Sequence, residues 1–148
     1  MEMATTESTQ EWLPGPRVVS RTQRIFVAED DLIIREAIVD ALAEDGHEVF
    51  GVGDGAELLE CIDIVSRGSL RGPDLIAMDV FMPRMSGLDV LECLRASGEM
   101  IPVVLITGFA TSELYARAAI AGSTLVLQKP FDLRELRRAA LPTAPWRR

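Results

Sequence analysis

The sequence has few cysteines, one histidine and no long apolar segment, and each shortage removes a class of function. Cys61 and Cys93 lie in helix-like patterns without metal-ligand or redox spacing, so we expect buried thiols. His47 stands beside the turn residue Gly46 with no second histidine or cysteine nearby, which predicts an inert surface histidine rather than a metal ligand. No apolar run approaches the ~20 residues that cross a bilayer, so we expect a soluble protein without a membrane partner.

Positive charge is also scarce. The chain has 15 Lys and Arg against 23 Asp and Glu, a formal net charge of -8. Proteins that bind nucleic acid gain affinity from clustered Lys and Arg, so direct nucleic-acid binding is not expected. The start of the chain lacks the basic and apolar regions of a secretory signal, which favours a cytoplasmic protein. A local basic face, expected to be solvated with partner docking as the alternative, consists of Arg134, Arg137, Arg138, Arg147 and Arg148.

The length and composition predict one folded domain between two short segments. Of the 148 residues 48% are hydrophobic and 26% are charged, as in a globular protein. Residues 1–23 are rich in Thr, Ser, Glu and Pro, and Pro14-Gly15-Pro16 would interrupt any regular element. We therefore expect a flexible N-terminal arm at 1–23, a domain at 24–141 and a C-terminal tail at 142–148.

Within this domain, short apolar runs alternate with segments of helical periodicity. The predicted strands are residues 25–28, 48–52, 74–79, 103–107 and 125–127. The predicted helices lie between them and after the last strand, at about 33–45, 56–66, 88–96, 113–121 and 133–141. This alternation predicts an α/β doubly wound (βα)5 fold, a five-stranded parallel sheet with helices on both faces. Such sheets bind ligands at the carboxyl ends of their strands.

Polar side chains stand at these predicted strand ends. Glu29 and Asp30 follow the first strand, Asp79 ends the third, Thr107 ends the fourth and Lys129 follows the fifth. Three carboxylates brought together would repel one another unless a divalent cation offsets their charge. Oxygen ligands of this kind suit Mg²⁺, with Mn²⁺ as a substitute.

The same residues predict a phosphoryl acceptor. Magnesium bound to two or three carboxylates keeps water positions that a phosphate oxygen can take. A carboxylate can itself be the nucleophile in phosphoryl transfer, and an ammonium and a hydroxyl can stabilise the charge on the phosphoryl oxygens. Asp31 lies outside this set, and we expect it to cap the start of the first helix.

These motifs resemble the response-regulator receiver domain, the phosphoacceptor module of two-component signalling. The resemblance covers about Arg24 to Leu141 and implies the flavodoxin-like strand order 2-1-3-4-5. It rests on Glu29-Asp30, on the segment MDVFMPRMSG from Met78 to Gly87, on Thr107 and on Lys129-Pro130-Phe131.

The resemblance implies a role for each matching position. Asp79 would take the phosphoryl group, and Lys129 would pair with the phosphate. Thr107 would move toward the phosphate and so alter the surface around the fourth helix, fifth strand and fifth helix. The implied magnesium ligands are Glu29, Asp30, Asp79 and the backbone carbonyl of Phe81. The implied loop-shaping residues are Pro83, Gly87 and Pro130.

Three positions depart from the family pattern or refine it. Val126 stands where many receivers carry a Tyr or Phe that swings inward with the Thr. Phe81 and Phe109 lie two positions beyond Asp79 and Thr107, where side chains can obstruct an attacking water. We therefore predict a long-lived phosphoryl group.

We therefore hypothesise that the protein is a receiver domain that accepts a phosphoryl group and is not an enzyme. A sensor histidine kinase or a histidine phosphotransfer protein would supply the phosphoryl group, and a downstream protein target would read the changed surface. Homodimer formation stays open, as does whether the chain is a stand-alone receiver or a piece of a longer protein. One alternative is an interaction module of the same fold that is never phosphorylated. A phosphohydrolase is the other, and Phe81 argues against it because such enzymes carry a second Asp at that position.

Overall fold

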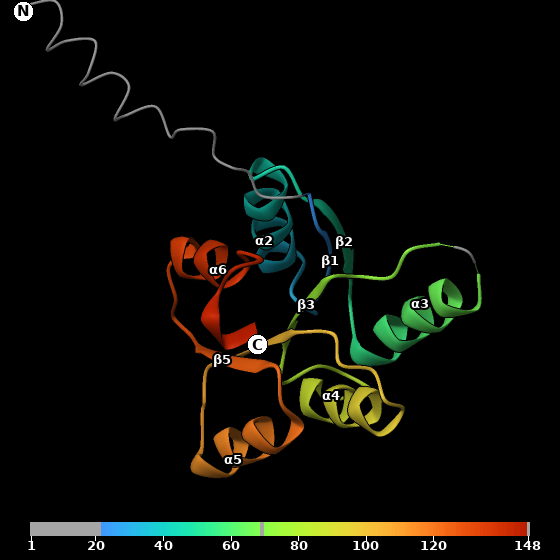
Figure 1. Cartoon of the computed structure of the whole chain (residues 1–148). Coiled ribbons are helices and arrows are strands. Elements are labelled where there is room, and N and C mark those ends of the chain that lie inside the picture. The colour runs from blue at the N-terminus through green and yellow to red at the C-terminus, as the bar shows by residue number, and fades with distance from the viewer. Residues whose placement is uncertain (1–21, 69, 148) are drawn as a thin grey trace, which may run out of the picture.

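The computed structural model describes residues 22–68 and 70–147, which form a five-stranded parallel sheet with helices on both faces (Figure 1). The strand order is β2-β1-β3-β4-β5, which confirms the predicted doubly wound fold. The strands are β1 (Arg24–Ala28), β2 (Glu48–Val52), β3 (Leu75–Asp79), β4 (Val103–Thr107) and β5 (Thr124–Gln128). Each lies within one residue of its predicted bounds. The expected N-terminal arm lies outside the described residues except for Thr22 and Gln23.

The helices divide between the two faces of this sheet. They are α2 (Leu32–Glu44), α3 (Gly55–Arg67), α4 (Gly87–Ala96), α5 (Ser112–Ala121) and α6 (Leu133–Ala139), followed by the short 3-10 helix η2 (Pro145–Arg147). Figure 1 shows α2 and α6 on one side of the sheet and α3, α4 and α5 on the other. Among the described residues, no helix is long and apolar enough to cross a membrane.

The central strands supply both halves of the core because neighbouring side chains of a strand point to opposite faces. Ile76 and Met78 of β3 pack with α3, α4 and α5, whereas Leu75 and Ala77 pack with α2 and α6. All residues of β3 and β4 are buried. Burying each large apolar side chain contributes about 1.5–3 kcal/mol, so the ends of these strands are held firmly.

Side-chain caps define the helix starts. Asp31 accepts the backbone N–H groups of Ile33 and Ile34 at 2.9 and 3.1 Å, which confirms its predicted role as the cap of α2. The caps of the other α-helices are Asp54, Ser86, Thr111 and Asp132. Such a cap contributes about 1 kcal/mol relative to alanine.

Two predictions about single residues were wrong. His47 is buried rather than on the surface, and its Nδ1 accepts the backbone N–H of Gln23 at 3.2 Å. Cys93 is exposed and Cys61 is only half-buried, at the edge of the core cluster between the sheet and α3, α4 and α5. Neither position could be assigned from helical periodicity alone.

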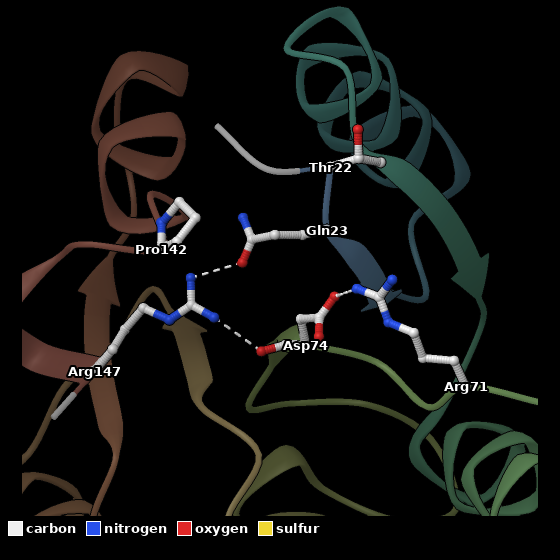
Figure 2. Close-up of a pocket in the computed structure, with 6 residues that line it drawn as sticks. All are labelled: Thr22, Gln23, Arg71, Asp74, Pro142 and Arg147. Atoms are coloured by element: carbon white, nitrogen blue, oxygen red, sulfur yellow. Dashed lines mark hydrogen bonds and ion pairs between the residues drawn. The ribbon is translucent and has the colours of Figure 1, made fainter. Parts of the chain in front are cut away.

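The segment after α6 packs back onto the domain at the amino ends of the strands. The Trp146 indole N–H donates to the carbonyl of Ala139 at 2.9 Å. Arg147 donates to Gln23 Oε1 at 2.7 Å and to the carbonyl of Asp74 at 2.9 Å (Figure 2). These contacts bound a cavity of about 610 Å³, lined by Thr22, Gln23, Arg71, Asp74, Pro142 and Arg147.

The prediction that the basic residues of this region are all solvated is therefore wrong. Arg134 is exposed, but Arg137 donates to Glu44 at 2.6 Å and Arg147 is half-buried. Gln23, placed by the sequence at the end of the flexible arm, is buried. Arg148 lies outside the described residues.

Candidate functional site

Three carboxylates meet at the carboxyl end of the sheet. Strands β1 and β3 pair in parallel with Ala28 opposite Met78, so the following residues, Glu29 and Asp79, are neighbours. One carboxylate oxygen from each of Glu29, Asp30 and Asp79 lies within 4.8 Å of the others. Glu29 and Asp79 are buried and Asp30 is exposed, so the predicted cluster has one open side.

Lys129 is the cation within this cluster. Thr107 pairs with Gln128 across β4 and β5, and the next residue, Lys129, therefore leaves the sheet beside Asp79. Its Nζ lies 2.9 Å from Asp79 Oδ2 and 3.5 Å from Glu29 Oε1. Burial alone would lower the pKa of Lys129, but its hydrogen bond and charge attraction to Asp79 outweigh burial and raise it. The lysine is therefore charged beside the acidic residues.

The buried carboxylate of Glu29 carries an electrostatic cost. Burial raises the pKa of Glu29 to about 7, and the negative charge of Asp79 adds to this rise. The backbone N–H of Asp31, 3.1 Å from Glu29 Oε2, and the ammonium of Lys129 act in the opposite direction. One lysine thus does not fully compensate the three carboxylates. Hard oxygen donors with excess negative charge fit a divalent cation such as Mg²⁺.

Thr107 is fully buried, and its hydroxyl is directed into the loop that follows β4. The hydroxyl accepts the backbone N–H of Phe109 at 3.1 Å and lies 3.3 Å from the carbonyl of the same residue. No hydrogen bond joins it to the acidic residues among those that the structure describes. The register brings Thr107 to the same end of the sheet, but its hydroxyl is held by its own loop.

The β3–α4 loop (residues 80–86) begins directly after Asp79 and contacts its carboxylate. The backbone N–H of Phe81 donates to Asp79 Oδ1 at 3.2 Å, and its side chain is 63% exposed. A Cβ at Gly87 would lie 2.4 Å from the backbone carbonyl oxygen of Asp79. Only glycine therefore lets α4 begin this close to β3.

The remaining loop-shaping predictions fall on both sides of the cluster. The carbonyl of Pro83 accepts the N–H of Met85 at 2.7 Å, which closes a tight turn within the β3–α4 loop. Pro130 follows Lys129 through a cis peptide bond. Both prolines lie in backbone that changes direction next to the site.

The sequence interpretation missed Arg35. Its guanidinium donates to the backbone carbonyl of Glu29 at 2.9 Å, so it holds the backbone that follows β1 in place. A Cβ at Gly51 would lie 3.2 Å from the side chain of Arg35, and the small residue on β2 makes room for it. A basic residue among apolar ones in the first turns of α2 was the available signal.

Comparison with known proteins identifies this arrangement. The family model described as "Response regulator receiver domain" matches residues 25–141. The transcriptional regulatory protein PdtaR of Mycobacterium tuberculosis is 38% identical over 115 residues, covering 77% of this chain and 53% of that protein. The response regulator MprA of Mycobacterium ulcerans is 35% identical over 113 residues, covering 76% and 46%.

Solved structures agree with these sequence relatives. The receiver domain of the Francisella response regulator 1452 has a TM-score of 0.70 at 28% identity, with 78% of this chain and 91% of that chain covered. The receiver domain of a putative response regulator NarL from Mycobacterium tuberculosis has a TM-score of 0.67 at 28% identity, with 80% and 93% covered.

The chain spans about half the length of the curated relatives that it matches. The family match covers the sheet except for Arg24, the first residue of β1, and includes every strand end that carries a candidate residue. The chain therefore belongs to the response-regulator receiver family of two-component systems.

Proposed function

We propose that this receiver accepts a phosphoryl group on Asp79 in a magnesium-dependent reaction and signals by a change in its binding surface. The observation that carries the proposal is the contact of Lys129 with Asp79 at 2.9 Å, inside a cluster of three carboxylates. An acceptor carboxylate, a metal-binding carboxylate pair and a phosphate-binding ammonium are then available in one place.

The residues that would hold magnesium are Glu29, Asp30, Asp79 and the backbone carbonyl of Phe81. When bound, the ion supplies positive charge that offsets the carboxylates and the phosphoryl oxygens. Burial and the charge of Asp79 raise the pKa of Glu29, and a divalent cation bound nearby would favour its ionised form. Mn²⁺, which also prefers oxygen ligands, is expected to substitute.

The phosphoryl donor is proposed to be a phosphohistidine of a sensor histidine kinase or a histidine phosphotransfer protein. A carboxylate oxygen of Asp79 attacks phosphorus, the P–N bond breaks, and its electron pair stays on the imidazole nitrogen. Lys129 stays paired with the negative charge on the transferred group. Because the acceptor is regenerated only when the acyl phosphate is hydrolysed, the protein is a signalling domain rather than an enzyme with its own substrate.

The signal is proposed to leave the site through Thr107. Its hydroxyl would leave its hydrogen bond with the backbone of Phe109 and bind the phosphate instead. This change would move the loop between β4 and α5 and alter the face formed by α5, β5 and α6. Val126, half-buried against the core, takes the place of the aromatic residue that moves in many receivers. Backbone movement at Thr107 would therefore carry the change by itself.

The partners are proposed to be proteins. A groove of about 590 Å³ lies beside the acceptor and is lined by Ile33, Ile34, Ala37, Ile38, Lys129, Pro130, Phe131 and Leu133. The Ile33 side chain is 80% exposed there, and such an apolar surface next to a reactive group suits a protein donor. The proposal includes a cytoplasmic location and no direct binding of nucleic acid, and homodimer formation stays open.

The test is mass spectrometry of the protein after incubation with acetyl phosphate and Mg²⁺. We expect one phosphoryl adduct that is absent from Asp79→Asn and from a sample treated with a chelator. A protein that remains unlabelled under conditions that label a known receiver would instead favour the unphosphorylated interaction module.

A further inference from the structure

A bidentate ion pair ties the β3–α4 loop to the start of α3. Arg84 donates to Asp54 through Nε, 3.0 Å from Oδ2, and through Nη2, 3.0 and 2.8 Å from Oδ1 and Oδ2. The Asp54 side chain is 16% exposed and the Arg84 side chain 60% exposed. The two planar groups meet as a fork, the geometry that gives Arg–carboxylate pairs their directional specificity.

Asp54 is already held in place by the helix that it caps. Its Oδ1 accepts the backbone N–H of Glu57 at 2.8 Å. The N–H of Glu57, and then the guanidinium of Arg84, keep the pKa of Asp54 below its usual range. Because Asp54 is ionised and held at the start of α3, its ion pair with Arg84 restrains the β3–α4 loop that carries Arg84.

The backbone of Arg84 is unusual for a residue with a side chain. Its φ is +68°, in the left-handed region that glycine adopts without cost and other residues seldom enter. Glycine at this position would thus relieve the backbone but lose the fork with Asp54. Arginine at this position thus combines a backbone conformation that is unfavourable for a side chain with a directional contact to Asp54.

Close packing limits where the rest of the loop can go. A Cβ at Gly55 would lie 2.6 Å from the carbonyl oxygen of Met85, so the end of the loop presses against the first turn of α3. At Gly87 the chain presses against the backbone of Asp79. Phe81, whose carbonyl is the proposed magnesium ligand, lies between Asp79 and these fixed points and is tied to Asp79 by one long hydrogen bond of 3.2 Å.

We propose that Arg84 and Asp54 are positioning residues for the acceptor site, which hold the β3–α4 loop, and with it the Phe81 carbonyl, in the conformation that binds magnesium. This inference rests on the proposed function of that cluster. Neither residue forms a described hydrogen bond with the acidic cluster or with Lys129. Substituting either residue is therefore expected to lower the affinity for Mg²⁺ and the labelling rate at limiting Mg²⁺. The labelling rate at saturating Mg²⁺ should not change.

The experiment compares Arg84→Gly, Arg84→Lys and Asp54→Asn with the unchanged chain by calorimetric titration of Mg²⁺. Removing a group that supports metal ligands typically weakens binding by 10–100-fold, and for this partly exposed pair we expect roughly tenfold in Arg84→Gly. Asp54→Asn, which keeps a good helix cap, should weaken binding similarly. Arg84→Lys, which keeps the charge without the fork, should fall between.

Two further measurements separate positioning from simple stabilisation. Arg84→Gly should unfold at the same temperature as the unchanged chain or higher, because glycine accepts the positive φ, and yet bind Mg²⁺ more weakly. Arg84→Gly combined with Asp54→Asn should be no weaker than either single variant, because both remove one interaction. As a matched control, Arg117→Ala removes an exposed fork to Glu92 on α4 and should leave Mg²⁺ affinity unchanged.

Unchanged Mg²⁺ affinity in both Arg84→Gly and Asp54→Asn would overturn the proposal, as would strictly additive losses in the combined variant. The proposed function fails separately, through the absence of acetyl phosphate labelling in the unchanged chain. Calorimetric titration does not depend on that labelling, so the two failures are distinguishable.

Discussion

At the scale of single residues, the acidic cluster is held by groups of three kinds. Lys129 balances part of its charge, Arg35 fixes the backbone of Glu29, and the N–H of Phe81 orients Asp79. Phe81 and Phe109 add apolar side chains that are 63% and 70% exposed. An exposed apolar side chain therefore follows Asp79 by two residues, and another follows Thr107 by two residues.

The two phenylalanines should slow the loss of the phosphoryl group. Because apolar side chains near an acyl phosphate hinder the approach of water, Phe81→Ala and Phe109→Ala should each lose label severalfold faster after excess acetyl phosphate is removed. The decay is followed by mass spectrometry. Tyr115→Ala, which removes an aromatic residue that is 48% exposed on α5, is the control and should decay at the original rate. Equal decay in all four proteins would refute the hypothesis of a long-lived phosphoryl group.

Stability should depend on pH through His47. Burial lowers the pKa of His47 below 6.5, with Asp45 and Asp74 opposing and Arg147 reinforcing the shift. The unfolded chain then binds more protons than the folded chain between the folded pKa and about 6.5. This contribution is present above about pH 6.5, declines as the pH falls through that window, and is lost below the folded pKa. Protonation of Nδ1 would also remove the acceptor for Gln23.

This dependence is measured as the difference between the original chain and His47→Gln in urea unfolding at several pH values. The difference is needed because Glu29, with a pKa raised to about 7, acts in the opposite direction and stabilises the fold as the pH falls from about 7 toward 4.5. Relative to His47→Gln, the original chain should lose stability on acidification below about pH 6.5. Parallel curves for the two proteins would contradict the assignment.

At the scale of elements, the short helix η2 closes the amino end of the sheet. Trp146 packs against the same core cluster as α2 and α6 and donates to the carbonyl of Ala139 at the end of α6. The Arg147 guanidinium bridges Gln23 and Asp74, which precede β1 and β3 (Figure 2). A segment predicted as a tail thereby joins two strands and a helix.

Trp146→Ala should therefore destabilise the domain. Replacing a fully buried aromatic residue by alanine costs ~3–5 kcal/mol, and for the half-buried Trp146 we expect about 2 kcal/mol in the free energy of unfolding. Urea unfolding measures the change. Thr143→Ala, at an exposed position of the same segment, should change the free energy of unfolding by less than ~0.5 kcal/mol. A Trp146→Ala variant as stable as Thr143→Ala would show that the segment does not support the fold.

At the scale of the whole molecule, the two ends of the sheet differ in structure. The carboxyl ends carry the acidic cluster and the apolar groove around Ile33, whereas the amino ends are closed by η2. A partner that docks in the groove can reach Asp79 without disturbing the contacts at the other end.

Ile33→Asp should separate protein-mediated from chemical phosphorylation. The charge would disrupt docking in the groove, so transfer from a phosphohistidine donor should fall by about tenfold, equivalent to about 1.4 kcal/mol. Labelling by acetyl phosphate should be unchanged because Asp79 and Lys129 are intact. Ile64→Asp, a comparable change at a residue 64% exposed on α3, is the matched control for both assays. Equal losses in the two variants would exclude the groove as the docking surface.

The sequence by itself determined the order of the elements and the positions of the acidic residues and Lys129. Strand and helix periodicity is local, and parallel strands place their carboxyl ends at one edge, so Glu29, Asp30, Asp79 and Lys129 could be predicted to meet. The roles assigned to them remain proposals.

Only the tertiary structure decided the contacts between segments far apart in the chain. The burial of His47, the fork between Arg84 and Asp54 and the packing of Trp146 depend on which side chains meet after the layers pack. A lone histidine, a loop arginine or a terminal tryptophan has no periodic pattern to reveal its partner. Their environments follow from the three-dimensional arrangement of neighbouring elements, which local sequence patterns do not encode.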